Sequence, residues 1–139
     1  MREILFRGKR TNNGEWVEGK GIDLNFDTAY ILTKEYDSCS GYYMGEFEVI
    51  PETIGQFTGL TDKNGKKIFE GDIVKHYHDK KFPKSYSKGV IYWEEEYLRW
   101  KRTSENATCC IANDCIYEVI GNIHDNPELL ERSENGTSI

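Results

Sequence analysis

Two histidines, His76 and His78, are the first residues whose type and spacing suit chemistry, because imidazole nitrogens bind transition metals. Residues two apart on a strand point to the same face, so the pair could share a metal ion or form a pH-sensitive patch. Zinc sites use three or four protein ligands, and no third ligand stands at a recognisable spacing. The pair is equally typical of the solvent face of an edge strand that runs into a lysine-rich loop. We favour this second interpretation and expect no metal site.

The cysteines are the next candidates for metal or redox chemistry: Cys39, Cys109, Cys110 and Cys115. Their spacing does not match zinc ribbons or zinc fingers. Adjacent cysteines on a strand point to opposite faces, so Cys109 and Cys110 cannot both share a site with Cys115. We interpret Cys109, Cys110 and Cys115 as small hydrophobic side chains in a β segment, and we expect no cofactor.

A lysine-rich segment, residues 75–88, is the best candidate for nucleic-acid binding. Lysines can follow phosphates while interleaved aromatic rings stack on bases. The candidate contacts are Lys80, Lys81, Lys84, Lys88, Phe82 and Tyr86. The alternative is a solvated loop whose charges keep a strand edge soluble. The acidic balance of the chain favours this alternative, because phosphate binding is driven by Lys and Arg displacing counterions.

Catalytic patterns are missing from the sequence. It has no Ser-His-Asp order, no phosphate-binding glycine loop and no dinucleotide fingerprint. Three consecutive carboxylates, residues 94–96, fall in an expected hairpin turn, where they would diverge. Trp16, Trp93 and Trp100 are more typical of packing than of a ligand cage. We therefore expect a protein that is not an enzyme.

Composition indicates small β units with thin cores. The chain has 139 residues, which suits one domain or two very small ones. Apolar residues make up 37% and aromatic residues 13%, and half of the aromatic residues are tyrosines, which suit half-exposed strands and interfaces. The net charge of −6 is uneven, since residues 1–60 carry −4, residues 61–124 carry +1 and residues 125–139 carry −3. Without a signal peptide or an apolar spanning segment, we expect an intracellular protein with reduced thiols and no membrane contact.

Alternating hydrophobicity predicts strands along most of the chain. The alternating segments are residues 3–7, 15–19, 22–26, 29–33, 46–50, 73–77, 89–94, 97–102 and 114–123. Three irregular segments, residues 34–45, 79–88 and 103–112, are predicted loops. Asn13 and Gly14 predict a type I′ hairpin turn. A short carboxyl-terminal helix is predicted after His124, with Asp125 or Asn126 as its cap and Pro127 at its first position.

The densest turn signals lie in residues 56–75. Asn64 and Gly65 tolerate positive φ, and Asp62 can accept hydrogen bonds from nearby backbone N–H groups. Gly59 and Gly71 predict two further turns. We expect this stretch to join the two halves of the architecture rather than to carry chemistry.

Three sequence blocks in the same order resemble the YopX family of small phage and prophage proteins. They are residues 2–7 (REILFR), 56–74 (QFTGLTDKNGKKIFEGDIV) and 117–129 (YEVIGNIHDNPEL). The resemblance implies a mainly β fold with small SH3-like barrel elements, a homo-oligomer and a bacterial host cytoplasm. It assigns no functional residue, and the intervening loops match no family pattern.

We therefore expect a mainly β protein with an N-terminal β unit (1–55), an SH3-like β unit packed on it (56–130) and a mobile tail (131–139). The favoured function is a non-catalytic phage or prophage accessory protein that binds a protein partner or its own copies. The alternatives are a nucleic-acid-binding module that uses residues 75–88 and a metal or hydrolytic site around His76 and His78. We expect any functional surface in residues 34–45 and 79–88.

Overall fold

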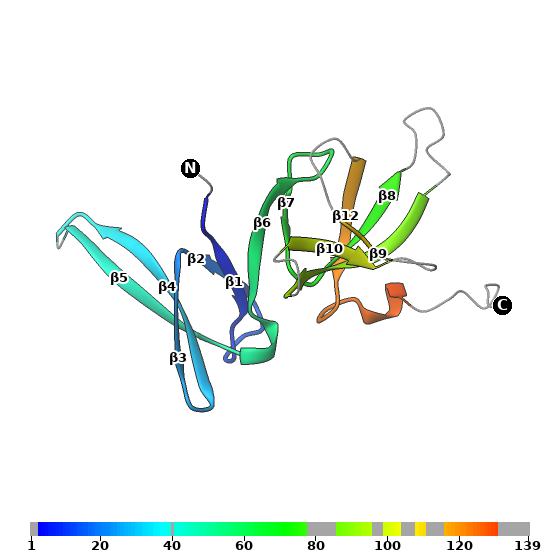
Figure 1. Ribbon diagram of the computed structural model, residues 1–139. Helices are drawn as coiled ribbons and strands as arrows, with labels where there is room; N and C mark the ends of the chain where they lie inside the picture. The colour runs from blue at the N-terminus through cyan, green and yellow to red at the C-terminus, as the bar shows by residue number, and fades with distance from the viewer. Residues whose placement is uncertain are drawn as a thin grey trace. The chain divides into compact units, whose positions relative to one another are not determined.

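Antiparallel pairing of short alternating segments builds almost all of the structure. The computed structural model describes residues 3–39, 41–77, 86–95, 99–103, 108–110 and 116–130. Its elements in chain order are β1 (Phe6–Lys9), β2 (Trp16–Gly19), β3 (Gly21–Asn25), β4 (Thr28–Asp37), β5 (Gly41–Val49), η1 (Pro51–Thr53), β6 (Gly55–Thr61), β7 (Lys67–Phe69), β8 (Asp72–Tyr77), β9 (Tyr86–Glu94), β10 (Arg99–Thr103), β11 (Thr108–Cys110), β12 (Ile116–Asn122) and η2 (Pro127–Leu130). The expected mainly β class is confirmed. The chain divides into unit 1, Met1–Phe57, and unit 2, Thr58–Ile139 (Figure 1).

Unit 1 contains a three-stranded sheet in the order β3-β4-β5 and a second sheet in which β1 pairs with β2 and with the start of β6. The β4–β5 hairpin is the longest in the unit, pairing from Ala29 opposite Val49 to Asp37 opposite Gly41 (Figure 1). Ala29, Ile31 and Val49 form its fully buried core. The core lies at the base of the hairpin, so the far end of the hairpin has little core beneath it.

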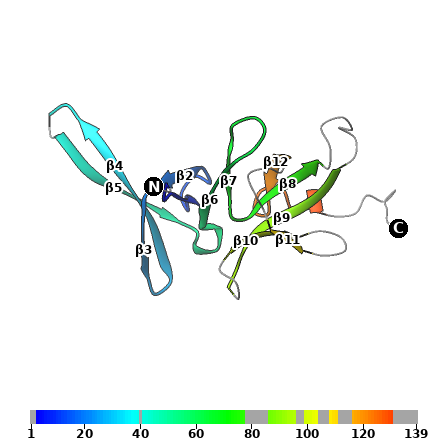
Figure 2. The ribbon, with the colours of Figure 1, turned by 45° about the horizontal axis from the view of Figure 1, so that its top comes forward.

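Unit 2 is organised around a sheet in the order β11-β10-β9-β8-β12, and β7 pairs with the end of β6. Figure 2 shows β8, β9 and β12 side by side. The core consists of Ile68, Val74, Ile91 and Tyr117. Val74 and Tyr117 come from the paired strands β8 and β12, so the core requires segments that are far apart in the sequence.

The predicted loop over residues 34–45 is wrong, because β4 continues to Asp37 and β5 begins at Gly41. The strands pair residue by residue across this segment, which satisfies backbone groups that a loop would leave to water. The other two predicted loops are also shorter than expected. Residues 86–88 belong to β9 and residues 108–110 to β11.

Two turn predictions also differ from the structure. Gly59 does not end a strand but lies inside β6 with φ of +93°, a conformation that glycine adopts without steric cost. Asn13 and Gly14 do not form a two-residue type I′ turn. Arg10 N–H donates to the Glu15 carbonyl at 2.8 Å, which encloses a four-residue loop, and the Asn13 side chain accepts from Glu15 N–H.

The predicted carboxyl-terminal helix is a 3₁₀ turn, Pro127–Leu130. Leu129 N–H donates to the Asn126 carbonyl, the i to i+3 pattern of a 3₁₀ turn. Two asparagine side chains accept from the backbone before the turn. Asn122 Oδ1 accepts from the N–H groups of His124 and Asp125, and Asn126 Oδ1 accepts from Asn122 N–H at 3.3 Å. Asn122 ends β12, and it therefore directs the chain out of the sheet.

Candidate functional site

One face of unit 2 gathers lysine and tyrosine side chains, and we call it the lysine–tyrosine face: Lys63, Lys75, Tyr77, Tyr86 and Lys88. On the paired strands β8 and β9, Tyr77 lies opposite Tyr86 and Lys75 lies opposite Lys88. The two tyrosine ring centroids are 5.8 Å apart. Because directly opposite residues share a face of the sheet, the β8–β9 pairing alone places four of these five side chains together.

Each tyrosine of this face carries a lysine ammonium over its ring. Lys75 Nζ lies 4.5 Å from the ring centroid of Tyr86, and Lys63 Nζ lies 4.5 Å from that of Tyr77. These distances are within the range of cation–π attraction. The fifth residue, Lys88, is held differently, because its ammonium donates to the Leu129 carbonyl of η2 at 2.8 Å.

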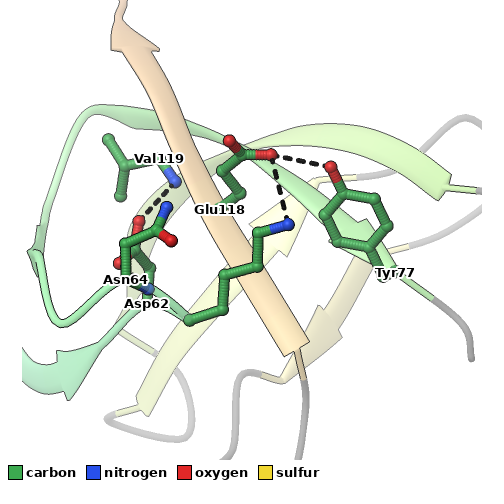
Figure 3. Close-up of polar contacts among 6 residues, drawn as sticks. Asp62, Asn64, Tyr77, Glu118 and Val119 are labelled. Atoms are coloured by element: carbon green, nitrogen blue, oxygen red, sulfur yellow. Dashed lines mark hydrogen bonds and ion pairs between the residues drawn. The ribbon is translucent and has the colours of Figure 1, made fainter. Parts of the chain in front are cut away.

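Glu118 places a negative charge within this basic face (Figure 3). Its Oε1 accepts a hydrogen bond from the Tyr77 hydroxyl at 2.7 Å and lies 3.9 Å from Lys63 Nζ. The hydrogen bond to Glu118 is the main cause that raises the pKa of Tyr77 above its ordinary value of 10.0, and burial and the carboxylate charge act in the same direction. The Tyr77 hydroxyl is the donor in this hydrogen bond, and the bond stabilises its protonated form.

Asp62 anchors the turn that presents Lys63 (Figure 3). Its Oδ1 accepts from the N–H groups of Asn64 and Lys66 at 2.8 and 2.9 Å, and its Oδ2 accepts from Val119 N–H at 3.0 Å. Burial alone would raise the pKa of Asp62 above its ordinary 3.8, but the three backbone donors and the Lys66 charge outweigh burial and lower the pKa. The ionised carboxylate thus fixes the turn against β12.

His76 lies on the opposite side of β8 from Lys75 and Tyr77. Its Nδ1 is 2.9 Å from Nη2 of Arg102, a side chain that is only 3% exposed, and its ring lies 5.2 Å from that of Tyr117. Because the arginine can only donate, Nδ1 of His76 is the acceptor. The expected solvent-facing edge position is therefore wrong: β8 lies between β9 and β12, and His76 faces the core side of the sheet.

The predicted nucleic-acid contacts divide into two groups. Tyr86 and Lys88 belong to the lysine–tyrosine face, whereas Lys80, Lys81, Lys84 and Phe82 lie outside the described residues, as does His78. Sequence analysis missed Lys63, Tyr77 and Glu118 as members of a site. A signal was present, because Lys75–Tyr77 and Tyr86–Lys88 are mirror-image pairs with the same spacing, but using it requires the register of β8 and β9.

The remaining candidates for chemistry are partly described. Cys39 is exposed, Cys109 and Cys110 lie in β11, and Cys115 is outside the described residues. Within the part of the chain that the structure describes, no three His, Cys, Asp or Glu side chains come together as a metal site. Trp93 and Trp100 pack edge to face at 5.0 Å, in agreement with the expected packing role.

Unit 1 offers a different feature, an open apolar groove of about 780 Å³ beside the β4–β5 hairpin. Its apolar lining comes from Leu5, Val17, Leu32, Met44 and Phe47. Met44, which lines the groove, is 61% exposed, and Tyr42 of the same strand is 68% exposed. Exposed apolar side chains that adjoin an apolar groove are typical of surfaces that bind another protein.

The sequence blocks, the β architecture and the comparisons with known proteins agree on the family. The family profile described as YopX protein matches residues 5–131, so the chain belongs to the YopX family. Its structure is similar to the crystal structure of protein EF1440 from Enterococcus faecalis, with 25% sequence identity, a TM-score of 0.53, and coverage of 94% of this chain and 100% of that chain. A comparison with curated proteins gave no match. Among the described residues, no helix is long and apolar enough to cross a membrane.

Proposed function

We propose that this chain is a non-catalytic phage or prophage accessory protein that acts in a bacterial host cytoplasm and binds a protein partner or its own copies. The β4–β5 hairpin of unit 1 is the binding surface. The resemblance to phage and prophage proteins supports the origin. The antiparallel strands of unit 2 and the 3₁₀ turn that follows them suit SH3-like barrel elements, which belong to the same proposal.

One observation carries this function: the far end of the β4–β5 hairpin presents Tyr42 and Met44 to solvent, although the chain could have placed polar residues there. A strand pair that exposes apolar side chains to this extent promotes aggregation of a monomer unless a partner covers it. The apolar groove beside the hairpin extends the surface. The proposal therefore assigns the surface to association with protein.

Sedimentation equilibrium over a wide range of protein concentration tests the self-assembly form of this function. We expect self-association that weakens in Tyr42→Ser. The matched control is Leu24→Ser, which removes an equally exposed apolar side chain, 63% exposed, from β3. A monomer at every concentration would exclude self-assembly, and equal weakening by the two variants would exclude the hairpin as the specific surface.

The lysine–tyrosine face favours nucleic-acid binding as the second candidate function. Two adjacent tyrosine rings, each with a lysine ammonium 4.5 Å from its centroid, offer stacking and phosphate contacts on one surface. The Glu118 carboxylate within the face and the net charge of −6 argue against it. Protein binding is therefore the better supported function.

Fluorescence anisotropy with a single-stranded oligonucleotide at low salt decides the second candidate. Nucleic-acid binding predicts an affinity that falls steeply with salt and falls further in Lys75→Glu and in the combined Lys80→Glu, Lys81→Glu variant. Lys20→Glu, an exposed charge reversal in unit 1, is the control. If the wild-type chain gives no anisotropy change at low salt, this candidate is excluded.

A further inference from the structure

Among the described residues, β5 pairs on its outer edge with another segment over only a short part of its length. In the order β3-β4-β5, β5 is the last strand, and β4 occupies one of its sides from Gly41 to Val49. On its other side, pairing is confined to the carboxyl-terminal end. There Val49 pairs with Arg10, and the Glu48 carbonyl accepts from Thr11 N–H. In the described part of unit 1, no strand pairs with this edge before Glu48.

The Thr11 contact shows which backbone groups face outward. The N–H and C=O of one residue point to the same side of a strand, and successive residues alternate. Because the Glu48 carbonyl points away from β4, the backbone groups of Glu46, Met44 and Tyr42 point away from it as well. These groups form a row of donors and acceptors that a further strand can pair with.

The side chains of β5 do not protect this edge in the usual way. Natural edge strands use lysine, proline or a bulge to prevent pairing with another strand. Residues 41–49 contain no proline or lysine, and their pairing with β4 is regular. Two cations from other segments lie against β5: Lys34 Nζ is 4.7 Å from the ring centroid of Tyr42, and the Arg10 guanidinium is 4.8 Å from that of Phe47. The edge therefore has the Tyr42 ring with the Lys34 ammonium at one end and the Glu46 carboxylate further along the strand.

We propose that two copies of this chain pair through β5, antiparallel and edge to edge, about a two-fold axis at Met44. This inference rests on the proposed function and specifies its surface. Met44 of one copy lies opposite Met44 of the other, and Tyr42 lies opposite the second copy's Glu46. The backbone N–H and C=O groups of Tyr42, Met44 and Glu46 all point away from β4. This register therefore forms main-chain hydrogen bonds between the two copies at each of these residues.

Charge complementarity favours this register over the two others in which the axis passes through a hydrogen-bonded pair, at residue 42 or at residue 46. The register places each Glu46 carboxylate beside the Tyr42 ring that already carries the Lys34 ammonium. Moving the axis to residue 46 would oppose the two Glu46 carboxylates, which is unfavourable for directly opposite like charges. Moving it to residue 42 would place Glu46 beyond the reach of Lys34. Of these three arrangements, the axis at Met44 is the one in which each Glu46 carboxylate meets a cation.

Oxidative cross-linking of Met44→Cys, made with Cys39→Ser to remove the exposed thiol, tests the axis directly. Residues directly opposite in a hydrogen-bonded pair have Cα atoms about 5.5 Å apart, which suits a disulfide. We expect a covalent dimer in which mass spectrometry finds the two introduced thiols joined. Glu46→Cys in the same background is the control. Its two Cα atoms would lie about 13 Å apart at 3.3 Å per residue, so no such disulfide should form.

A second pair of variants tests the main-chain bonds. Met44→Pro removes an outward N–H without removing a bond to β4, whereas Met44→Ala keeps the N–H and removes only the side chain. We expect Met44→Pro to raise the dimer dissociation constant about tenfold relative to Met44→Ala. Circular dichroism verifies that both variants fold. If Met44→Pro does not fold, the two cysteine variants decide whether the β5 strands pair.

The outcomes separate this pairing from the broader function. Cross-linking at position 44 and not at 46 supports the pairing. Cross-linking that is equal at both positions, or absent from 44 in a protein that sedimentation shows to self-associate, overturns the pairing and leaves the proposed function intact. A chain that stays monomeric overturns the pairing together with self-assembly, and leaves only binding to a different protein.

Discussion

Asp62 is the side chain that connects the most distant parts of unit 2. A single carboxylate accepts from two N–H groups of its own turn and from Val119 of β12, and only 6% of the residue is exposed. The bonds within the turn confirm the sequence prediction that Asp62 binds nearby backbone groups. The bond to Val119 spans 57 positions, and no local pattern could have predicted it.

Replacing this carboxylate with an amide should destabilise the protein. Asp62→Asn keeps the shape but replaces one acceptor oxygen with an NH₂ group that faces a backbone donor. We expect a loss of about 2 kcal/mol in the free energy of unfolding, the scale of hydrogen bonds to a charged group. Urea denaturation measures it, with Glu95→Gln, an exposed carboxylate of unit 2, as the control. A loss no larger than that of the control would contradict the role given to Asp62.

The same residue predicts a pH dependence. Because the pKa of Asp62 is lower in the folded chain than its ordinary 3.8, the unfolded chain binds the proton more tightly. The stabilisation is therefore complete above pH 3.8 and is lost as pH falls through the lower folded pKa. The stability difference between the wild-type chain and Asp62→Asn should shrink as pH falls below 3.8. A difference that stays constant down to acid unfolding would argue against an ionised Asp62.

At the scale of elements, the turn between β7 and β8 depends on one glycine. Gly71 has φ of +89°, its N–H donates to the Ile91 carbonyl, and its carbonyl accepts from Ile123 N–H. A Cβ placed on Gly71 would meet no atom closer than 3.7 Å, so a side chain is disfavoured by the backbone conformation and not by lack of space. The turn was predicted from the sequence, and the two tertiary hydrogen bonds show why its conformation cannot relax.

Gly71→Val should therefore cost stability before it affects any binding surface. We expect about 2 kcal/mol, the upper end of the cost of a left-handed conformation for an L-residue, because valine is β-branched. Thermal unfolding followed by circular dichroism measures the loss. Gly71→Asn is the comparison, since asparagine adopts positive φ more readily and should lose less. Equal losses for the two variants would point to the side-chain volume instead.

Strand existence was easier to predict than strand length. Alternating hydrophobicity located most of the strands, because each buries one face. It failed at residues 34–45, where Ser38, Cys39 and Gly41 resemble loop composition although the chain pairs from Lys34 opposite Met44 to Asp37 opposite Gly41. The end of the hairpin buries little, so its strands are specified by pairing and not by a hydrophobic face, and pairing is invisible in a single sequence.

For the whole molecule, the two units have separate cores. Ala29, Ile31 and Val49 form one, and a cluster that includes Ile91 and Tyr117 forms the other. The aromatic-rich, aliphatic-poor composition predicted such small cores. The sequence also located the turn residues that hold the lysine–tyrosine face, but not the face itself, because its members Lys63, Tyr77 and Glu118 meet only through tertiary register.

Separate cores predict separate responses to mutation. Ile31→Ala and Ile91→Ala each remove a fully buried side chain, and each should cost between about 2 and 5 kcal/mol in its own unit. Hydrogen–deuterium exchange should rise mainly in residues 21–49 for Ile31→Ala and mainly in residues 67–122 for Ile91→Ala. A uniform rise across the chain in both variants would show that the units unfold together.

The order of the cores along the chain also bears on how the protein is made. Synthesis proceeds from the amino terminus, and domains generally fold as their residues emerge. Unit 1 ends at Phe57, so all of its core residues are synthesised before those of unit 2. The core of unit 2 includes Tyr117, and the Asp62 carboxylate gains its hydrogen bond from Val119 N–H only after Val119 has been synthesised. The β5 edge can thus be complete while the carboxyl-terminal strands of unit 2 are still being synthesised, and copies on neighbouring ribosomes of one message can meet at that stage.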